Sequence, residues 1–199
     1  MNQQKAITVY GASSEQIDSA YKEAAFNLGR EIARAGLALV CGGGKAGLMK
    51  AAIDGATELG GHTIGVLPQF MIDNDWQHPR LSEMIATPDM HTRKQTLANR
   101  SIAAIACPGG CGTFEELTEI ITWRQLNLYR GQVVILNTLG YYDPLLRLLD
   151  RAIDQGFMRA DHRRLYFVAS TPEEAVEMAR TAARLIEAAE IYFKANSQP

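Results

Sequence analysis

Short apolar runs alternate along the chain with segments whose apolar residues repeat every three to four positions. Apolar runs of four to six residues are typical of strands buried on both faces, and their alternation with helices is typical of a parallel sheet. We therefore expect an α/β fold, a Rossmann-like open parallel sheet with helices on both faces. The expected strands are Ala6–Tyr10, Ala38–Cys41, Thr63–Leu67, Ile102–Cys107, Val133–Leu136 and Leu165–Val168.

Glycines mark the ends of the helices between these strands. A glycine directly after a helical pattern is a natural C-terminal cap, because it adopts the left-handed conformation without strain. The helices that end in this way are Ile17–Ala35 before Gly36, Leu48–Leu59 before Gly60 and Tyr141–Gln155 before Gly156. A last helix is expected from Pro172 to Lys194. With no linker or repeat, we expect one domain over residues 1–195 and a tail over 196–199.

The length and the net charge of the chain restrict the class of ligand that we expect it to bind. A chain of 199 residues is long enough to bury a core without metals or disulfides. Its net charge of −2, with acidic and basic residues interspersed, predicts no nucleic-acid partner and no membrane anchor. The first ten residues are too polar for a signal peptide, and no apolar run could span a bilayer. We expect a cytoplasmic protein that binds a small molecule.

The three cysteines, Cys41, Cys107 and Cys111, lie in apolar or glycine-rich segments and form no Cys-x-x-Cys pair. We expect all three to be reduced, buried thiols and expect no metal site.

The residues Pro108-Gly109-Gly110-Cys111-Gly112-Thr113-Phe114-Glu115-Glu116 follow one expected strand and open a helix. The three glycines can adopt backbone angles closed to other residues, and the helix directs free N–H groups at a ligand. The segment therefore predicts a phosphate site. Its alternative is a plain strand-to-helix turn, because Thr113 and Glu116 have the spacing of a capping box. A place in the first helical turn would favour the ionised form of Glu116.

A second glycine-rich loop, Gly42-Gly43-Gly44-Lys45-Ala46-Gly47, follows the second expected strand. It satisfies the G-x-G-x-x-G pattern of dinucleotide sites, but that pattern belongs after the first strand and needs an acidic residue at the end of the next. It also fails as a Walker loop, since Ala46 stands where Ser or Thr should hold magnesium. Because ligands of parallel sheets bind where the loops after neighbouring strands meet, we expect this loop to face the same ligand.

Two adjacent cations, Arg93 and Lys94, lie in an expected first helical turn, Met90–Lys94. Adjacent helical residues point about 100° apart, so one cation is expected to reach a ligand while the other supports it. The alternative is a solvated basic turn. His91 is expected to orient or cap this turn, whereas His62, His78 and His162 are read as ordinary surface or loop residues.

These motifs together resemble the LONELY GUY (LOG) family of cytokinin-activating phosphoribohydrolases, long mislabelled lysine decarboxylases. The matching segments are Gly42-Gly43-Gly44-x-x-Gly47-Leu48-Met49, Met90-His91-x-Arg93-Lys94, Pro108-Gly109-Gly110-x-Gly112-Thr113-x-x-Glu116 and Thr122-Trp123-x-Gln125-Leu126. The resemblance implies a Rossmann-like homodimer without a cofactor. It further implies hydrolysis of the N-glycosidic bond of a cytokinin riboside 5'-monophosphate, which gives the free base and ribose 5-phosphate.

By this resemblance Arg93 and Glu116 match the catalytic pair of the family. Asp75 lies where many bacterial relatives have a substrate-contacting glutamate, although its side chain is shorter. The full set of expected substrate contacts is Gly43, Gly44, Asp75, Lys94, Gly109, Gly110, Cys111, Gly112, Thr113, Phe114, Glu115 and Thr122.

Cleavage of a nucleoside C1'–N9 bond passes through an oxocarbenium-like sugar. Glu116 would stabilise that cation or act as general base toward water. Arg93 would hold the 5'-phosphate or polarise the leaving base, and the sequence does not choose between these roles. Lysine decarboxylation is disfavoured because nothing resembles a lysine-anchored pyridoxal phosphate site.

Two other functions stay open at this point. One is a general AMP or purine nucleotide nucleosidase, and the other is a non-catalytic carrier of a nucleotide or of molybdenum cofactor. An N6 substituent on the substrate would need an apolar pocket. Its candidates are Phe70, Met71 and Trp76 in the Pro68–Trp76 loop, with Trp123 or Met90 as further possibilities.

Overall fold

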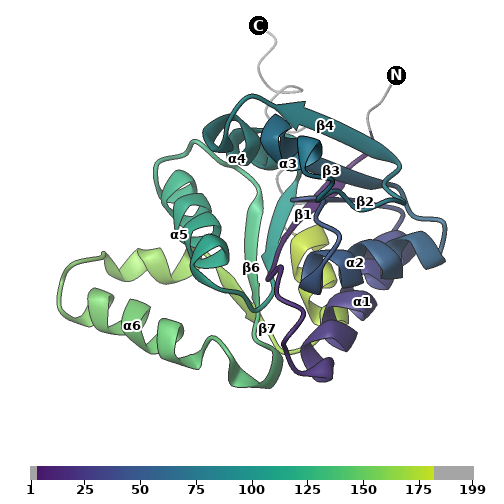
Figure 1. Cartoon of the computed structure of the whole chain (residues 1–199). Helices are drawn as coiled ribbons and strands as arrows, with labels where there is room; N and C mark the ends of the chain where they lie inside the picture. Colours follow the sequence, from purple (N-terminus) through teal and green to yellow (C-terminus); the bar gives the residue numbers. More distant parts are fainter. Residues whose placement is uncertain (1–3, 182–199) are drawn as a thin grey trace, which may run out of the picture.

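A computed structural model describes residues 4–181. It contains one sheet of seven parallel strands in the order β4-β3-β2-β1-β5-β6-β7 (Figure 1). The strands are β1 (Ala6–Tyr10), β2 (Ala38–Cys41), β3 (Thr63–Pro68), β4 (Glu83–Thr87), β5 (Ala103–Ala106), β6 (Gln132–Leu136) and β7 (Phe167–Ala169). The predicted fold class is confirmed, and each predicted strand is present within two residues of its expected ends.

The α-helices are α1 (Ser19–Arg34), α2 (Gly47–Glu58), α3 (Gln69–Asp73), α4 (Met90–Asn99), α5 (Cys111–Gln125) and α6 (Asp143–Asp154). Short 3-10 helices cover Thr138–Gly140 and Ala160–Arg164. The predicted glycine caps are confirmed, since Gly36, Gly60 and Gly156 have φ values of 71°, 70° and 80°. The last helix begins at Pro172 as predicted, whereas its expected end at Lys194 and the 196–199 tail lie outside the described residues.

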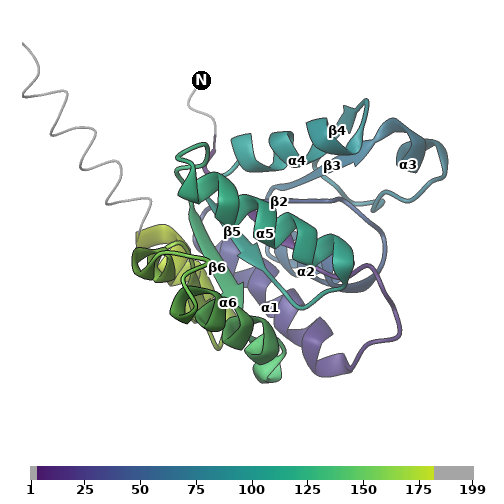
Figure 2. The same ribbon diagram turned by 90° about the vertical axis from the view of Figure 1, so that its left-hand side faces the viewer.

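The two faces of the sheet carry separate apolar cores. One face packs Ile7, Val9 and Leu39 against α1, α2 and the helix after Pro172. The opposite face packs Val40 and Ile135 against α4 and α5. Figures 1 and 2 show these helical layers on either side of the strands. Residues that alternate along each strand therefore serve opposite cores, which explains why the strands are apolar throughout.

Strand β4 and helix α3 are absent from the sequence-based prediction. The burial of β4 alternates, and Glu83 and Met84 on this edge strand are partly or largely exposed. Helix α3 spans only five residues, and none of them is buried. Neither element therefore has the continuous apolar run or the long helical period that reveals the others.

The order of the strands fixes where a ligand can bind. The chain leaves β1 toward β2 and returns to the other side of β1 as β5, so the loops after β1 and β5 diverge at this point. They remain in contact, because Ala12 N donates to Pro108 O at 3.2 Å. Ligands of open α/β sheets bind at such a switch point, beyond the carboxyl ends of the strands.

Candidate functional site

A buried ion pair joins α4 to α5 beside the switch point. Arg93 Nη1 donates to Glu116 Oε1 at 2.8 Å, and the two side chains are 8% and 12% exposed. Arg93 Nε donates to Val66 O at 3.0 Å, which fixes the guanidinium at the end of β3. The structure thus brings together the two residues expected to form a catalytic pair.

The environment of Glu116 differs from the expectation. Helix α5 begins at Cys111, so Glu116 lies in the second turn and not in the first. Burial raises the pKa of Glu116 above its ordinary value of 4.5, and the Arg93 guanidinium opposes this shift. The expectation that a helix terminus stabilises the ionised form is wrong, and the ion pair with Arg93 performs that task.

The capping-box alternative is also wrong. Gly110 is the N-cap of α5, with no side-chain cap, and Thr113 is the third residue of the helix. Within the described residues, the backbone N–H groups of Cys111, Gly112 and Thr113 have no hydrogen-bond acceptor, and the first bonded donor is Phe114 N, to Gly110 O. Three free N–H groups at a helix N-terminus are suited to an anion.

The glycines of this loop leave space for neighbouring atoms and do not adopt unusual backbone angles. Gly109, Gly110 and Gly112 have no positive φ, so the expectation of special angles is wrong for all three. A Cβ added at Gly110 or Gly112 would meet nothing within 4 Å, whereas at Gly109 it would lie 2.5 Å from Thr113 Cβ. Gly110 and Gly112 therefore leave the helix N-terminus open to a ligand, and Gly109 makes room for Thr113.

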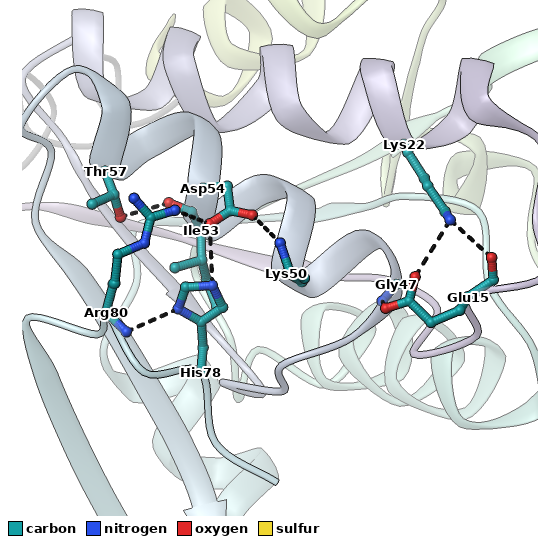
Figure 3. A network of polar contacts seen from close by, with 9 residues as sticks. All are labelled: Glu15, Lys22, Gly47, Lys50, Ile53, Asp54, Thr57, His78 and Arg80. Carbon is teal, nitrogen blue, oxygen red and sulfur yellow. Dashed lines mark hydrogen bonds and ion pairs between the residues drawn. The ribbon is translucent and has the colours of Figure 1, made fainter.

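The other glycine loop ends at a helix N-terminus that is already occupied. Gly47 N donates to Glu15 Oε1 at 3.2 Å (Figure 3). Leu48 N donates to Ala12 O at 2.8 Å. Lys22 Nζ holds the same glutamate, at 3.4 Å from Oε2. The carboxylate stands where a dinucleotide pyrophosphate would bind, which gives a physical reason against NAD at this G-x-G-x-x-G segment.

A cavity of about 350 Å³ lies between this loop and Arg93. Its polar lining includes Ser13, Lys45 and Arg93, and its apolar lining includes Met49, Leu67, Met71 and Trp76. Gly44 also lines it, whereas Gly43, with φ of 66°, shapes the turn. Asp75 does not line the cavity. Its carboxylate accepts hydrogen bonds from Lys45 Nζ at 2.9 Å and from Gln77 Nε2 at 3.1 Å, and the side chain is 82% exposed.

Among the expected apolar candidates, the structure places Met71 and Trp76 in this cavity. Phe70 packs edge-on against Trp76, with ring centroids 6.3 Å apart. Trp123, on α5, packs against the core, and Met90 is exposed; neither lines the cavity.

A smaller cavity of about 190 Å³ lies on the other side of the switch-point loops. Gly109 and Gly110 line it together with Ser14, Tyr21 and Tyr141. Tyr141 supports the loop, since its hydroxyl donates to Gly109 O at 2.6 Å. The adjacent residues Ser13 and Ser14 thus line one cavity each.

Lys94 supports the site and does not face it. Its Nζ donates to Glu119 Oε1 at 3.0 Å and to Glu115 Oε1, and its side chain is only 7% exposed. Burial alone would lower the pKa of Lys94, but the bonds to Glu115 and Glu119 outweigh it and raise that pKa. The expected division between adjacent cations is therefore present, with Arg93 at the cavity and Lys94 tying α4 to α5.

Several other expected contacts line neither cavity. Cys111, Phe114, Glu115 and Thr122 are exposed on α5, and the Thr122 hydroxyl donates to Thr118 O on its own helix. The exposure of Cys111 contradicts the expectation of three buried thiols. Cys41 and Cys107 are buried, and burial raises their pKa values to about 11 and about 12.

The expectation for His62, His78 and His162 holds in part. His62 and His78 lie in loops as expected, but His78 is buried, at 3% exposure, and His162 is buried in a 3-10 helix, at 6% exposure, so these two are not surface residues. His91 is exposed, and the cap of α4 is Asp89, whose side chain accepts from Thr92 N at 2.7 Å. Ser13 was missed as well, although its place directly after the first strand, beside the switch point, is a signal that could have found it.

The described residues contain no group of three or more His, Cys, Asp or Glu side chains that could hold a metal ion. No helix within 4–181 is long and apolar enough to cross a membrane.

The fold defines a Rossmann-like α/β protein in which the N-terminus of α5 presents three free backbone N–H groups. A family model described as "Possible lysine decarboxylase" matches residues 49–179. The cytokinin riboside 5'-monophosphate phosphoribohydrolase LOG5 of Arabidopsis thaliana is 39% identical over 173 residues, which cover 87% of this chain and 76% of the relative. The enzyme LOG of Oryza sativa subsp. japonica is 40% identical over 86% of this chain and 71% of the relative. The chain belongs to the LOG family.

Among solved structures, the molybdenum cofactor carrier protein of Chlamydomonas reinhardtii is similar, with a TM-score of 0.69 and 25% identity over 91% of this chain and 99% of the carrier. The molybdenum cofactor binding protein of Rippkaea orientalis has a TM-score of 0.68 and 25% identity, over 90% of this chain and 98% of that protein.

Proposed function

We propose that this protein hydrolyses the N-glycosidic bond of N6-modified adenosine 5'-monophosphates. Water attacks C1' while the C1'–N9 bond breaks, the base leaves with a proton, and ribose 5-phosphate remains. The observation that carries this proposal is the buried Arg93–Glu116 pair beside a helix N-terminus with free N–H groups. The LOG relatives supply the reaction class.

The 5'-phosphate would bind at the N-terminus of α5. The N–H groups of Cys111, Gly112 and Thr113 can each donate to a phosphate oxygen, and the helix dipole adds a positive potential. The space over Gly110 and Gly112 lets the phosphate approach the backbone.

The base would occupy the 350 Å³ cavity. The guanidinium of Arg93 lines this cavity, and the free N–H groups of α5 are available for the phosphate, which together support a role of Arg93 at the base. In this proposal Arg93 polarises the leaving base, and Met71 and Trp76 form the apolar wall for an N6 substituent.

Glu116 would face the anomeric carbon between these two subsites. As a carboxylate it stabilises the developing oxocarbenium ion or accepts the proton of the attacking water, a contribution of about 10²- to 10⁴-fold. The carboxylate form is the one that Arg93 favours. The expected homodimer and the cytoplasmic location belong to the same proposal.

Side-by-side assays test the substrate. The purified protein is incubated with N6-isopentenyladenosine 5'-monophosphate and with AMP, and the released base is followed by chromatography. A faster release from the prenylated nucleotide supports the proposal, and equal rates make the protein a general nucleotide nucleosidase.

A carrier is the second candidate, favoured by the similarity to the molybdenum cofactor carrier protein. Its identity of 25% is lower than the 40% of the rice enzyme, and the buried Arg93–Glu116 pair supports hydrolysis over carriage. Tight binding without release of base would establish the carrier.

A further inference from the structure

Residues 69–80 form part of the apolar wall of the larger cavity, and polar contacts to the second glycine loop and to α2 hold this segment, among them the ion pairs Lys45–Asp75 and Arg80–Asp54. The segment supplies Met71 and Trp76 to the cavity. Backbone hydrogen bonds join it to the glycine loop, from Lys45 N to Trp76 O at 2.9 Å and from His78 N to Gly43 O at 2.8 Å. His78 is the only residue of 69–80 whose side chain is buried against the body of the protein.

The imidazole of His78 links the segment to α2. Its Nδ1 accepts a hydrogen bond from Arg80 N at 3.1 Å, so Nε2 carries the proton and donates to Asp54 Oδ1 at 3.2 Å (Figure 3). Both ring nitrogens are thereby used in the neutral form. The bond to Arg80 N closes a turn within the segment, and the bond to Asp54 is the one that reaches the body of the protein.

Asp54 is a fixed acceptor. Its carboxylate, 17% exposed, also binds Lys50 on the same helix and Arg80 on the segment. Burial lowers the pKa of His78, although the Asp54 carboxylate raises it, so the imidazole stays neutral at pH 7. Lys50 and Arg80, the other charged groups around the imidazole, lower the same pKa. The contact is therefore a hydrogen bond from a neutral donor to a carboxylate that two cations hold in place.

We infer that His78 is a positioning residue for substrate preference: its hydrogen bond to Asp54 holds Trp76 and Met71 in place and so favours nucleotides with an apolar N6 substituent over AMP. This inference rests on the proposed substrate class. The proposed phosphate and sugar contacts lie on α5 and not on the segment, so loosening the wall affects the N6 substituent more than the phosphate and the sugar.

Two substitutions of His78 distinguish its hydrogen bond to Asp54 from its hydrogen bond to Arg80 N. In His78→Asn the short amide still accepts from Arg80 N, as Asn does in many turns, but does not reach Asp54. In His78→Gln the longer amide keeps a donor in reach of Asp54. Asp54→Ala removes the acceptor from the other side, together with the ion pair between Asp54 and Arg80 of the segment, and replaces His78→Asn if that variant does not fold. His62→Gln is the matched control, because His62 lies beside Glu83, outside the segment, and is half-exposed.

The readout is the ratio of the dissociation constants for AMP and N6-isopentenyladenosine 5'-monophosphate. Binding is followed by the fluorescence of Trp76 in a background that carries Trp123→Phe and Glu116→Gln, where Trp76 is the only tryptophan and the proposed hydrolysis is blocked. We expect His78→Asn and Asp54→Ala to reduce the preference for the prenylated nucleotide roughly tenfold, the scale of discrimination by an apolar pocket. His78→Gln and His62→Gln should keep it.

An unchanged ratio in folded His78→Asn or Asp54→Ala, or an equal loss in His78→Gln, would overturn the inference. The assay measures binding and not turnover. If the protein releases no base, the proposed hydrolysis is wrong, yet the ratio of the two dissociation constants still tests the role of His78. A wild-type protein that binds both nucleotides equally would also overturn the inference.

Discussion

The guanidinium of Arg93 occupies the space that a side chain on Gly42 would fill. A Cβ at position 42 would lie 2.0 Å from Arg93 Nη2 and 2.9 Å from Met49 Sδ. This contact, together with the bond from Nε to Val66 O, directs Arg93 toward Glu116. The second glycine loop thus contributes to the site by leaving room for the cation.

Gly42→Ala should therefore act on Arg93 without removing its charge. Since Gly42 has no positive φ, the added methyl group does not strain the backbone and instead displaces the guanidinium. We expect kcat/KM to fall about 10²-fold, because small misplacements of catalytic groups have effects of this size. The measurement is steady-state base release, with Gly44→Ala, where the nearest atom is the flexible end of Met49 at 3.0 Å, as the milder control. Wild-type activity in folded Gly42→Ala would contradict this role of the loop.

The raised pKa of Glu116 predicts the acidic side of the pH profile. If the carboxylate is the active form, activity falls as the pH drops through the pKa of Glu116, which lies above 4.5 because of burial. Arg93 lowers this pKa, so Arg93→Gln should raise it further and move the acidic limb of log kcat/KM to higher pH. If the acidic limb of the pH profile does not move in Arg93→Gln, Arg93 does not set the pKa of Glu116 that limits activity.

The three glycines before and within α5 should respond differently to alanine. Gly110→Ala and Gly112→Ala meet no neighbour, so both should fold with stability within about 1 kcal/mol of wild type. Their methyl groups protrude toward the proposed phosphate, and KM for the nucleotide should rise roughly tenfold or more while the corresponding nucleoside is unaffected. Gly109→Ala collides with Thr113 and should lower the melting temperature.

Thermal melts and KM values for nucleotide and nucleoside give the comparison. An unaltered KM in Gly110→Ala and Gly112→Ala would place the phosphate elsewhere.

The sequence predicted the elements whose signal is local. The buried strands appear as apolar runs because both faces of the sheet are covered, and Gly36, Gly60 and Gly156 mark helix ends by their left-handed conformation. Strand β4 was not predicted because it is an edge strand with partly exposed residues such as Glu83 and Met84.

The site was predictable in its motifs but not in its contacts. Arg93 and Glu116 stand out by motif, whereas the burial that raises the pKa of Glu116 depends on how α4 packs on α5. Lys94 lies next to Arg93, yet only the three-dimensional arrangement shows that it binds Glu115 and Glu119. His78 has no motif around it, and its burial follows from the contact between α2 and a segment that begins eleven residues after that helix ends.

The catalytic role of Glu116 is tested by comparing wild type with Glu116→Gln in the release of base and ribose 5-phosphate from N6-isopentenyladenosine 5'-monophosphate. The Gln oxygen can still accept from Arg93 Nη1, so the variant should fold with a melting temperature within about 4 °C of wild type. We predict equimolar base and ribose 5-phosphate from the wild type and a rate at least about 10²-fold lower from Glu116→Gln. Retained hydrolysis in the folded variant would contradict the proposed role of Glu116 in cleavage of the glycosidic bond.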